Sequence, residues 1–488
     1  MLRGVQVQVL LPAFFTAGLM YFYRLFFPGF AGRRTEIVSG AARDKNGDIN
    51  TREAAMTISI TDLGSIGDGQ TRNTGIIQQA IDTCWEAGGG KVVIPAGRFL
   101  SGSIRLRSNI ELHLESGAEL ISSLDPADMT DFLRDLEAED DNRDTGWEGG
   151  CFLFARHEEN ITISGSGRID GRGREVFFED ETDGGSHESP LKVRGFRPRT
   201  SFLEDVRNLT VKDVTFYDAA FWTLHMAGCR DVLIENIRID NNDRGPNNDG
   251  IDPDSCRNVI IRGCKIKCAD DCIVMKTTAP MTKKYGPCRN ILISGCILHS
   301  RSSALKIGTE TWGDIHHVTM SDCILEDCTR GIGIWSRDGG RISDIMVHHV
   351  TGNTLRYRDR VKQDSEVVVW WGKGEPVFLS ATERAGVSRI PGVIEHVVMD
   401  HLSFSCEGAI MIAGEQNAPI RDVRISDSAF LWKKQGSLYP DCLDEQPSAR
   451  GVYRHKVPAV YIRCGENISL EDHVSITVDE SLKEYITV

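Results

Sequence analysis

The chain has 488 residues, with 56 Lys and Arg against 70 Asp and Glu, which gives a formal net charge of −14. This acidic balance argues against a nucleic-acid binder, but it does not exclude an anionic substrate, because a local basic patch can override the global sign. The 48 glycines and 16 prolines are spread along the sequence, so low complexity does not explain them.

The first 55 residues differ in character from residues 57–488, which we predict to be one folded domain. Residues 5–23 are mostly apolar, but Pro12 and Gly18 interrupt the run and no Ala-x-Ala cleavage site is present. The run is marginal for a membrane-spanning helix, which needs about 20 apolar residues. Three interpretations stay open: a membrane anchor, a secretory signal, or a segment that the functional protein lacks, with translation beginning at Met56. We favour the third.

Residues 57–100 have the pattern of a strand, a turn, a helix and a second strand. The helix is predicted over Gly75–Ala87, with Thr74 as its capping residue. Its apolar face consists of Ile77, Ala80, Ile81 and Cys84. One amphipathic helix before a long β region suits a cap over the open end of a repeat fold, because the first repeat otherwise exposes its core.

From residue 109 onward one polar residue, followed by an apolar alternation, recurs along the chain. The pattern occurs in NIELHL (109), NITISG (160), NLTVKD (208), DVLIEN (231), NVIIRG (258), NILISG (290), HVTMSD (317), DIMVHH (344), HVVMDH (396), DVRISD (422) and NISLED (467). The intervals from 231 to 258, 290 to 317 and 317 to 344 are each 27 residues. Such repeats of short strands predict a parallel β-solenoid. The leucine-rich repeat skeleton is absent, and a β-propeller needs four strands per blade where these units supply about three.

The 14 cysteines point to buried packing rather than to disulfides or a metal site. Cys264, Cys296 and Cys323 each follow an apolar strand at the same offset, as small hydrophobic residues stacked in a core do. No Cys-x-x-Cys pair has a partner at zinc spacing, so we predict no metal. This placement favours a reducing compartment and hence a cytoplasmic location; the alternative is a secreted or membrane-anchored protein.

The stretch from Asn247 to Lys276 is expected to carry the chemistry. It holds two predicted strands, Asn258–Lys265 and Cys272–Lys276, each after an acidic cluster. The clusters are Asp249 with Asp252 and Asp254, and Asp270 with Asp271. A stacked repeat with carboxylates at matching places concentrates acids on one patch.

Four segments align as successive coils: DGIDPD (249–254), DCIVMK (271–276), SALKIG (303–308) and RGIGIW (330–335). Their third column, a predicted core ladder, is Ile251, Ile273, Leu305 and Ile332. Side chains alternate along a strand and coils lie about 4.8 Å apart, so the fourth and sixth columns share one outer surface. Those columns include Asp252, Asp254, Lys276, Lys306 and Trp335. Asp249 and Asp271 stack at the edge of this surface, and Asp270 reaches it only if the backbone bulges.

Three carboxylates in one patch cannot all ionise easily, so one of them becomes a proton donor beside permanent bases. An acid and a base on opposite sides of a bond is the requirement for glycoside hydrolysis, and a separation of about 6.5–9.5 Å predicts inversion. The alternative is that these residues cap turns and accept backbone hydrogen bonds, as most loop Asp residues do. We favour this alternative for Asp252 and Asp254 only.

Two motifs resemble those of glycoside hydrolase family 28, the polygalacturonase-like pectin hydrolases. NND at 247–249 followed by DGID resembles the NTD motif of the family, and ADD at 269–271 followed by CI resembles its GDD motif. The resemblance runs from about Thr57 to the C-terminus. It implies an all-β fold, a right-handed parallel β-helix with an N-terminal capping helix, and inverting hydrolysis without a cofactor. Asp270 would be the general acid, and Asp249 with Asp271 would activate water.

The chain also departs from that family. Ser302–Ser303–Ala304 stands where the family commonly has GHG, and Gly333–Ile334–Trp335 stands where it has RIK. The supporting histidine and both cations that hold a galacturonate carboxylate are therefore absent. The segments SALKIGTE and GIWSRDGG resemble the bacterial rhamnogalacturonan-type branch more than the polygalacturonases.

Other residues are candidates for binding the substrate. Lys276, Lys306 and Arg337 would form a relocated carboxylate clamp, and Asn247 belongs to the first motif. Glu310 would be an additional acid and Trp312 a sugar-stacking platform, although each is equally well an ordinary turn residue.

We therefore predict a glycosidase that cleaves O-glycosidic bonds in galacturonate- or rhamnogalacturonan-type pectic oligo- or polysaccharides. One alternative is a β-helical uronate lyase or epimerase, which neutralises the substrate carboxylate with calcium or Arg and removes a proton with a base. Another is a non-catalytic carbohydrate-binding solenoid. No nucleic acid is expected as a partner, a membrane only if residues 5–23 are an anchor, and the sequence does not define an oligomeric state.

Overall fold

The computed structural model describes residues 56–131, 150–178, 191–357, 372–383, 389–436, 438–440, 442–445, 452–454, 456–470 and 473–488. The chain divides into two compact units, residues 1–54 and 55–488, and all of the described residues belong to the second. The apolar run at residues 5–23 lies outside them. Within the described ranges, no helix has the length and apolar character needed to cross a bilayer.

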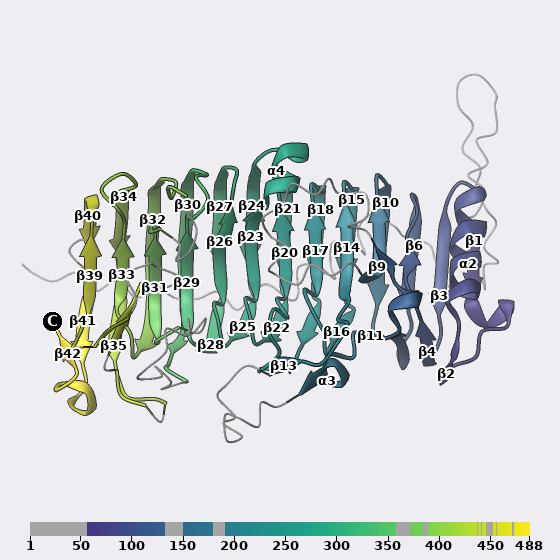
Figure 1. Ribbon diagram of the computed structural model, residues 1–488, viewed down its shortest axis with the longest axis horizontal. Helices are drawn as coiled ribbons and strands as arrows, with labels where there is room; N and C mark the ends of the chain where they lie inside the picture. Colours follow the sequence, from purple (N-terminus) through teal and green to yellow (C-terminus); the bar gives the residue numbers. More distant parts are fainter. Residues whose placement is uncertain are drawn as a thin grey trace, which may run out of the picture. The chain divides into compact units, whose positions relative to one another are not determined.

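Three strands in each turn of the chain form a parallel β-helix, as the repeats predict (Figure 1). One sheet has 12 strands. They are β5 (Ile104–Arg105), β8 (Thr130–Asp131), β9 (Gly150–Arg156), β14 (Arg199–Glu204), β17 (Leu224–Ala227), β20 (Ile251–Asp254), β23 (Ile273–Thr277), β26 (Leu305–Thr311), β29 (Arg330–Trp335), β31 (Glu375–Ser380), β33 (Ile410–Ala413) and β39 (Val460–Arg463). Apart from the antiparallel β8, each strand pairs in parallel with the strand of the next coil.

A second sheet, of 24 strands, contains the other two strands of each coil. The first coils contribute β1 (Met56–Ser59), β2 (Asp68–Arg72), β3 (Gly90–Ile94) and β4 (Gly97–Ser101). The recurring motifs form β6 (Ile110–Leu114), β10 (Glu159–Gly165), β15 (Arg207–Lys212), β18 (Arg230–Glu235), β21 (Arg257–Arg262), β24 (Cys288–Ser294), β27 (Ile315–Ser321), β30 (Ile342–Thr354), β32 (Ile394–Cys406), β34 (Ile420–Ser426) and β40 (Gly465–Leu470). The third strands are β7 (Ala118–Ser122), β11 (Arg168–Asp170), β16 (Thr215–Tyr217), β19 (Arg238–Asp240), β22 (Lys265–Cys268), β25 (Ile297–Ser300), β28 (Ile324–Cys328), β35 (Ala429–Trp432) and β41 (Ser475–Val478).

The polar residue that begins each recurring motif turns the chain at a corner of the coil. In all eleven motifs this residue has a positive φ, between 52° and 63°. Asn, Asp and His tolerate this left-handed conformation better than other residues with a side chain, which explains the choice of residue. Neighbouring corners are also bonded: Asn258 Nδ2 donates to Asp231 Oδ1 (2.8 Å), and Asn290 Nδ2 donates to Asn258 Oδ1 (2.9 Å). The corner residues thus form a polar ladder from coil to coil.

The capping helix is α2 (Thr74–Glu86), at the purple end of the β-helix (Figure 1). Its buried residues are the four predicted for its apolar face: Ile77, Ala80, Ile81 and Cys84. It packs on β1, β3 and β5 and so covers the first coil. The prediction of Thr74 as the cap is wrong, because Asn73 precedes the helix and the Thr74 hydroxyl accepts a hydrogen bond from the Gly102 amide (2.7 Å).

The core ladder has the predicted register, in which Ile251 pairs with Ile273, Ile273 with Leu305 and Leu305 with Ile332. The predicted strand Asn258–Lys265 is instead two strands, β21 and β22, because Gly263 (φ 64°) turns the chain between them.

Two other features of the sequence are explained by the fold. The interval from residue 258 to 290 is longer than 27 residues because it contains α4 (Ala279–Tyr285). Cys264, Cys296 and Cys323 are buried and free, in agreement with their predicted place in the core.

The corner ladder predicts a stability difference between two variants of Asn258. Asn258→Ala removes two hydrogen bonds and places a Cβ-bearing residue in the left-handed region, so the free energy of unfolding should fall by about 1–2 kcal/mol. Asn258→Gly removes the same hydrogen bonds without the conformational strain and should cost less. Urea unfolding of both variants measures the difference. Equal losses would show that the left-handed corner contributes nothing.

Candidate active site

The three predicted catalytic acids come from two adjacent coils. Asp249 lies in the loop before β20, and Asp270 and Asp271 lie directly before β23. The Gly250 amide donates to the Asp271 carbonyl (2.9 Å), which sets the two segments side by side. One carboxylate oxygen from each of the three acids lies within 4.8 Å of the others.

A buried asparagine fixes this arrangement. Asn248 Oδ1 accepts hydrogen bonds from the amides of Ala269 (2.9 Å) and Asp270 (3.3 Å) on the next coil. Its Nδ2 donates to the carbonyl of Asn242 (2.6 Å) within its own loop. The same side chain therefore holds the loop of the first acid against the backbone of the second.

The acids are closer together than the sequence suggested. The expectation of about 6.5–9.5 Å between acid and base is wrong here, because the relevant oxygens lie within 4.8 Å. The reason is that backbone and Asn248 hydrogen bonds hold the loop of Asp249 directly against the segment of Asp270 and Asp271. Asp249 is 2 % exposed and Asp271 is 1 % exposed, whereas Asp270 is half-buried and is the member that meets solvent.

Burial and mutual repulsion keep protons on this group. Burial, and then the charges of Asp270 and Asp252, raise the pKa of Asp249 well above its usual range. Burial, and then the charge of Asp271, raise the pKa of Asp270 to about 6. Asp249 and Asp270 therefore hold protons more strongly than isolated carboxyl groups, as closely spaced acids do.

Lys276 is the counter-charge of the buried acids. Its Nζ lies 3.2 Å from Glu310, 3.6 Å from Asp249 and 3.7 Å from Asp252. Burial alone would lower the pKa of Lys276, but these acids outweigh it and raise the pKa well above its ordinary value. The ammonium also lies 4.6 Å from the centre of the Trp222 ring, a cation–π contact.

Lys306 is in the same way the counter-charge of Asp271. Its Nζ lies 2.6 Å from Asp271 Oδ2 and 5.0 Å from the centre of the Trp335 ring. Asn247 completes the surroundings of Asp270: its Nδ2 lies 3.5 Å from Asp270 Oδ2, and its Oδ1 accepts a hydrogen bond from Arg197 (3.0 Å). The structure thus gathers Asn247, Lys276, Lys306 and Glu310 around the three acids.

Two predicted binding residues have other surroundings. Arg337 is fully buried, and its guanidinium donates to the carbonyls of Ser380 and Thr382 (both 3.1 Å). It holds the backbone of the next coil, so its predicted place in a carboxylate clamp is corrected to a structural role. The guanidinium of Arg389 lies 3.1 Å from the centre of the Trp312 ring. One face of that indole is therefore covered by a guanidinium rather than open to a sugar.

Asp254 and Asp252 differ, although turn capping was predicted for both. Asp254 accepts hydrogen bonds from the amide (2.9 Å) and the hydroxyl (2.6 Å) of Thr278, at the start of α4, as predicted. Asp252 is fully buried inside β20, and neither of its oxygens has a hydrogen-bond partner among the described residues. Burial raises the pKa of Asp252 to about 8. It belongs to the acidic group, not to a turn.

Sequence reasoning missed two residues on the preceding coils. The Thr223 amide donates to the Asp249 carbonyl (3.0 Å), which places Trp222 beside Asp249. The buried guanidinium of Arg199 lies over the ring of Trp222 at 5.0 Å, and burial lowers the pKa of Arg199 to about 9. An alignment of FWTL (221–224) with NDGI (248–251) as one more coil places Trp222 in the same column as Asp249 and would have identified it.

Three clustered carboxylates are also a possible divalent-cation site, since Ca²⁺ prefers oxygen ligands. Lys276 and Lys306 already neutralise Asp249 and Asp271 in this structure.

Comparison with known proteins places this arrangement in context. The model of the glycosyl hydrolases family 28 matches residues 84–363. A probable polygalacturonase of Vitis vinifera is 30 % identical over 316 residues, which span 62 % of this chain and 62 % of the relative. An exopolygalacturonase structure from Thermotoga maritima matches with a TM-score of 0.54 and 22 % identity, over 80 % of this chain and 89 % of its own. A family 28 exopolygalacturonase from Yersinia enterocolitica matches with a TM-score of 0.57 and 18 % identity, over 87 % and 78 %. The two structures confirm the fold, a right-handed parallel β-helix.

The contacts of Lys276 predict a large loss of stability when its charge is removed. Lys276→Met leaves three acids without a counter-charge, and removing one partner of a buried pair costs about 3–5 kcal/mol. This loss should be largest at pH 9, above the pKa of about 8 of Asp252, and shrink toward pH 4, where the carboxylates with raised pKa values are neutral. Chemical denaturation at both pH values measures it.

Lys284→Met is the matched control. Lys284 is 41 % exposed, and its partner Glu204 also contacts Arg156 at 2.6 Å. Glu204 is buried but keeps Arg156 as its partner, and the lost ammonium is partly in solvent, so this variant should lose only about 1 kcal/mol. Equal losses in the two variants would contradict the special role of Lys276.

Proposed function

Because the chain belongs to the glycosyl hydrolases family 28, we propose that it hydrolyses O-glycosidic bonds in pectic oligo- or polysaccharides. The observation that carries the proposal is the convergence of Asp249, Asp270 and Asp271 within 4.8 Å. A proton donor and a base at one place are what glycoside hydrolysis requires.

Asp270 is proposed as the general acid. It is the most exposed of the three acids, and with a pKa of about 6 it is protonated in mildly acidic solution. Its proton passes to the leaving glycosidic oxygen as the bond from that oxygen to the anomeric carbon breaks. Asn247, 3.5 Å from Asp270 Oδ2, orients the donor as a positioning residue.

Asp249 and Asp271 are proposed to hold the attacking water. Asp249 Oδ1 and Asp271 Oδ1 are buried and accept no hydrogen bond from any described residue. Buried acceptors of this kind are ordinarily satisfied, and a water between them would donate to both. Lys306, at 2.6 Å from the other oxygen of Asp271, supplies the charge for an anionic base. The water oxygen bonds to the anomeric carbon, and its proton goes to that base.

Two considerations favour opposite configurations of the product, inversion and retention. The family resemblance implies inversion, whereas carboxyl groups about 5–5.5 Å apart or closer favour a retaining mechanism with a covalent intermediate. We propose inversion, because the two unsatisfied oxygens lie on stacked acids that suit a shared water. NMR of the first product anomer decides between the two.

We propose a rhamnogalacturonan-type substrate rather than unsubstituted polygalacturonan. Ser303 replaces the histidine of the family motif, and Trp335, 3 % exposed and stacked 4.9 Å from Phe378, replaces its lysine. The two nearby lysines, Lys276 and Lys306, are already in contact with acids. A site whose cations are neutralised in this way suits a neutral sugar at the cleaved bond.

The substrate proposal predicts an order of rates. The protein should release product from rhamnose-containing galacturonate oligomers faster than from galacturonate-only oligomers of equal length. Asp270→Asn should lower the rate by about 10²–10⁴-fold, because it removes the general acid. Asp240→Asn, which affects an exposed ion pair with Arg238, should leave the rate unchanged. The reverse preference would reject the neutral-sugar site, and equal rates for Asp270→Asn and the unmodified protein would reject the acid.

The pKa of Asp270 predicts the pH profile. A general acid works only when protonated, so kcat/KM should fall about tenfold per pH unit above pH 6. Lys306 lowers the pKa of Asp270, so Lys306→Met should move this limb to higher pH. Initial rates between pH 4 and pH 8 measure both effects. A limb that stays in place, or moves to lower pH, would contradict the electrostatic argument.

Because the three clustered carboxylates offer oxygen ligands for calcium, a calcium-dependent lyase is a second candidate function. A lyase forms an unsaturated product that absorbs in the ultraviolet and loses activity when calcium is chelated. Activity that survives chelator and gives no such absorbance would exclude it. A carbohydrate-binding protein without activity would release no product from any of these substrates.

A further inference from the structure

A group of histidines and an aspartate lies on the second sheet, away from the strands that carry the acids. His348 and His349 lie on β30, and Asp400 and His401 lie on β32. His348 pairs with Asp400 in the register of the two strands. His349 and His401 follow in left-handed corners (φ 54° and 49°).

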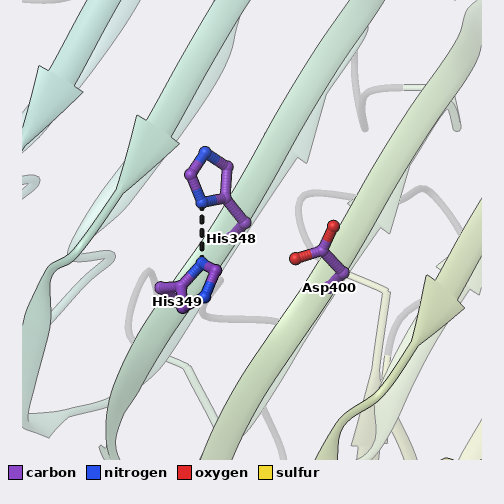
Figure 2. A group of neighbouring side chains, drawn as sticks. All are labelled: His348, His349 and Asp400. Carbon is purple, nitrogen blue, oxygen red and sulfur yellow. Dashed lines mark hydrogen bonds between the residues drawn. The ribbon is translucent and has the colours of Figure 1, made fainter.

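The side chains of this group converge (Figure 2). The Nδ1 atoms of His348 and His349 lie 2.9 Å apart, and the carboxylate of Asp400 points toward them from the neighbouring strand. One ligand atom from each of the three residues lies within 4.8 Å of the others. Two ligands at about 2.0–2.1 Å from one zinc ion are about 2.8–3.4 Å apart for angles between 90° and 109°. The observed nitrogen separation lies in this range.

His401 supports the group from outside. Its Nδ1 lies 2.9 Å from Asp400 Oδ1, a contact that orients the carboxylate. Its ring stacks on that of His349, with centroids 4.6 Å apart and planes 6° apart. Such outer contacts are typical of metal sites, where they fix the ligands and tune their affinity.

We propose that His348, His349 and Asp400 bind one divalent transition-metal ion, with Zn²⁺ as the ion that fits best. Two imidazoles and one carboxylate are a common three-residue zinc set that leaves a position for water. Mg²⁺ and Ca²⁺ prefer oxygen ligands and do not match this set. His348 and Asp400 are half-buried and His349 is exposed, so an ion can reach the group from solvent.

The ion would link two coils. The strands β30 and β32 are adjacent in space but are separated in the sequence by residues 355–393. A bound metal stabilises the state that holds its ligands together, so zinc should raise the melting temperature. This role is independent of the proposed hydrolysis, since the acids directly precede strands of the 12-stranded sheet and the histidines lie on strands of the 24-stranded sheet.

The chain contains a matched control in His316 and His317. Their Nδ1 atoms lie 3.2 Å apart, and their rings meet edge to face with centroids at 4.6 Å. In the described part of the chain, however, no third ligand atom completes a group of three with this pair. A pair of neighbouring histidines is therefore not enough, and the carboxylate distinguishes the two places.

The test uses the full chain without a histidine tag, freed of metal with chelator and then titrated with Zn²⁺ by calorimetry. We expect one zinc ion per chain and an increase in melting temperature that Mg²⁺ does not produce. Asp400→Asn, His348→Gln and His349→Asn should each weaken binding at least tenfold; Asn suits the left-handed φ of His349. Equal melting temperatures of the metal-free proteins would show that these variants fold.

Two further variants complete the test. His316→Gln and Asp270→Asn should bind zinc as the unmodified chain does. Absence of zinc binding would overturn the proposal. Equal affinity in all variants would overturn it too, because the bound zinc would then belong to scattered surface histidines. Loss of binding in Asp270→Asn alone would overturn it too, because the ion would then belong to the acid cluster.

Discussion

The parallel register between neighbouring coils is the constraint on which the acidic site depends. Asp249 and Asp271 are 22 positions apart in the sequence and meet only because Ile251 pairs with Ile273. Side chains alternate along a strand, so a slip of one residue would turn the core ladder outward and the charged columns inward. The core therefore selects one register, and that register brings the acids together. The corner ladder and the buried Asn248 reinforce the same alignment.

Charge balance is the second requirement, because the site buries more acids than an apolar core tolerates. Asp249, Asp252 and Glu310 surround one ammonium, that of Lys276, and Asp271 has its own in Lys306. The cations offset only part of the repulsion, and the remainder appears as raised pKa values of Asp249, Asp252 and Asp270. The proposed proton donor depends on this same repulsion, because it is what raises the pKa values.

The sequence predicted which way side chains point and which residues lie side by side better than it predicted how deeply those side chains are buried. Periodicity correctly identified the core ladder, the buried face of α2 and the parallel coils, because each follows from a repeating pattern of apolar residues. The same periodicity predicted that the three acids share one patch. Alternation says only that a side chain leaves the core, not what then covers it. Asp252 points outward and is nevertheless fully buried, and Arg337 is buried against the next coil. These contacts come from residues distant in sequence, so no local pattern encodes them.

The acids and the residues that depart from the family pattern lie on different coils, so the proposed chemistry and the proposed choice of sugar depend on different residues. The acids lie in the loops before β20 and β23, whose sequences resemble the family motifs. The departures lie on the next two coils, where Ser303 is buried and Trp335 packs between Phe378 and the ammonium of Lys306. This tryptophan stands where the family resemblance implies a lysine, and the proposed substrate rests on that difference. The register that aligns the acids is set by backbone pairing and by the core ladder, so an outward side chain such as Trp335 can differ while that register is kept.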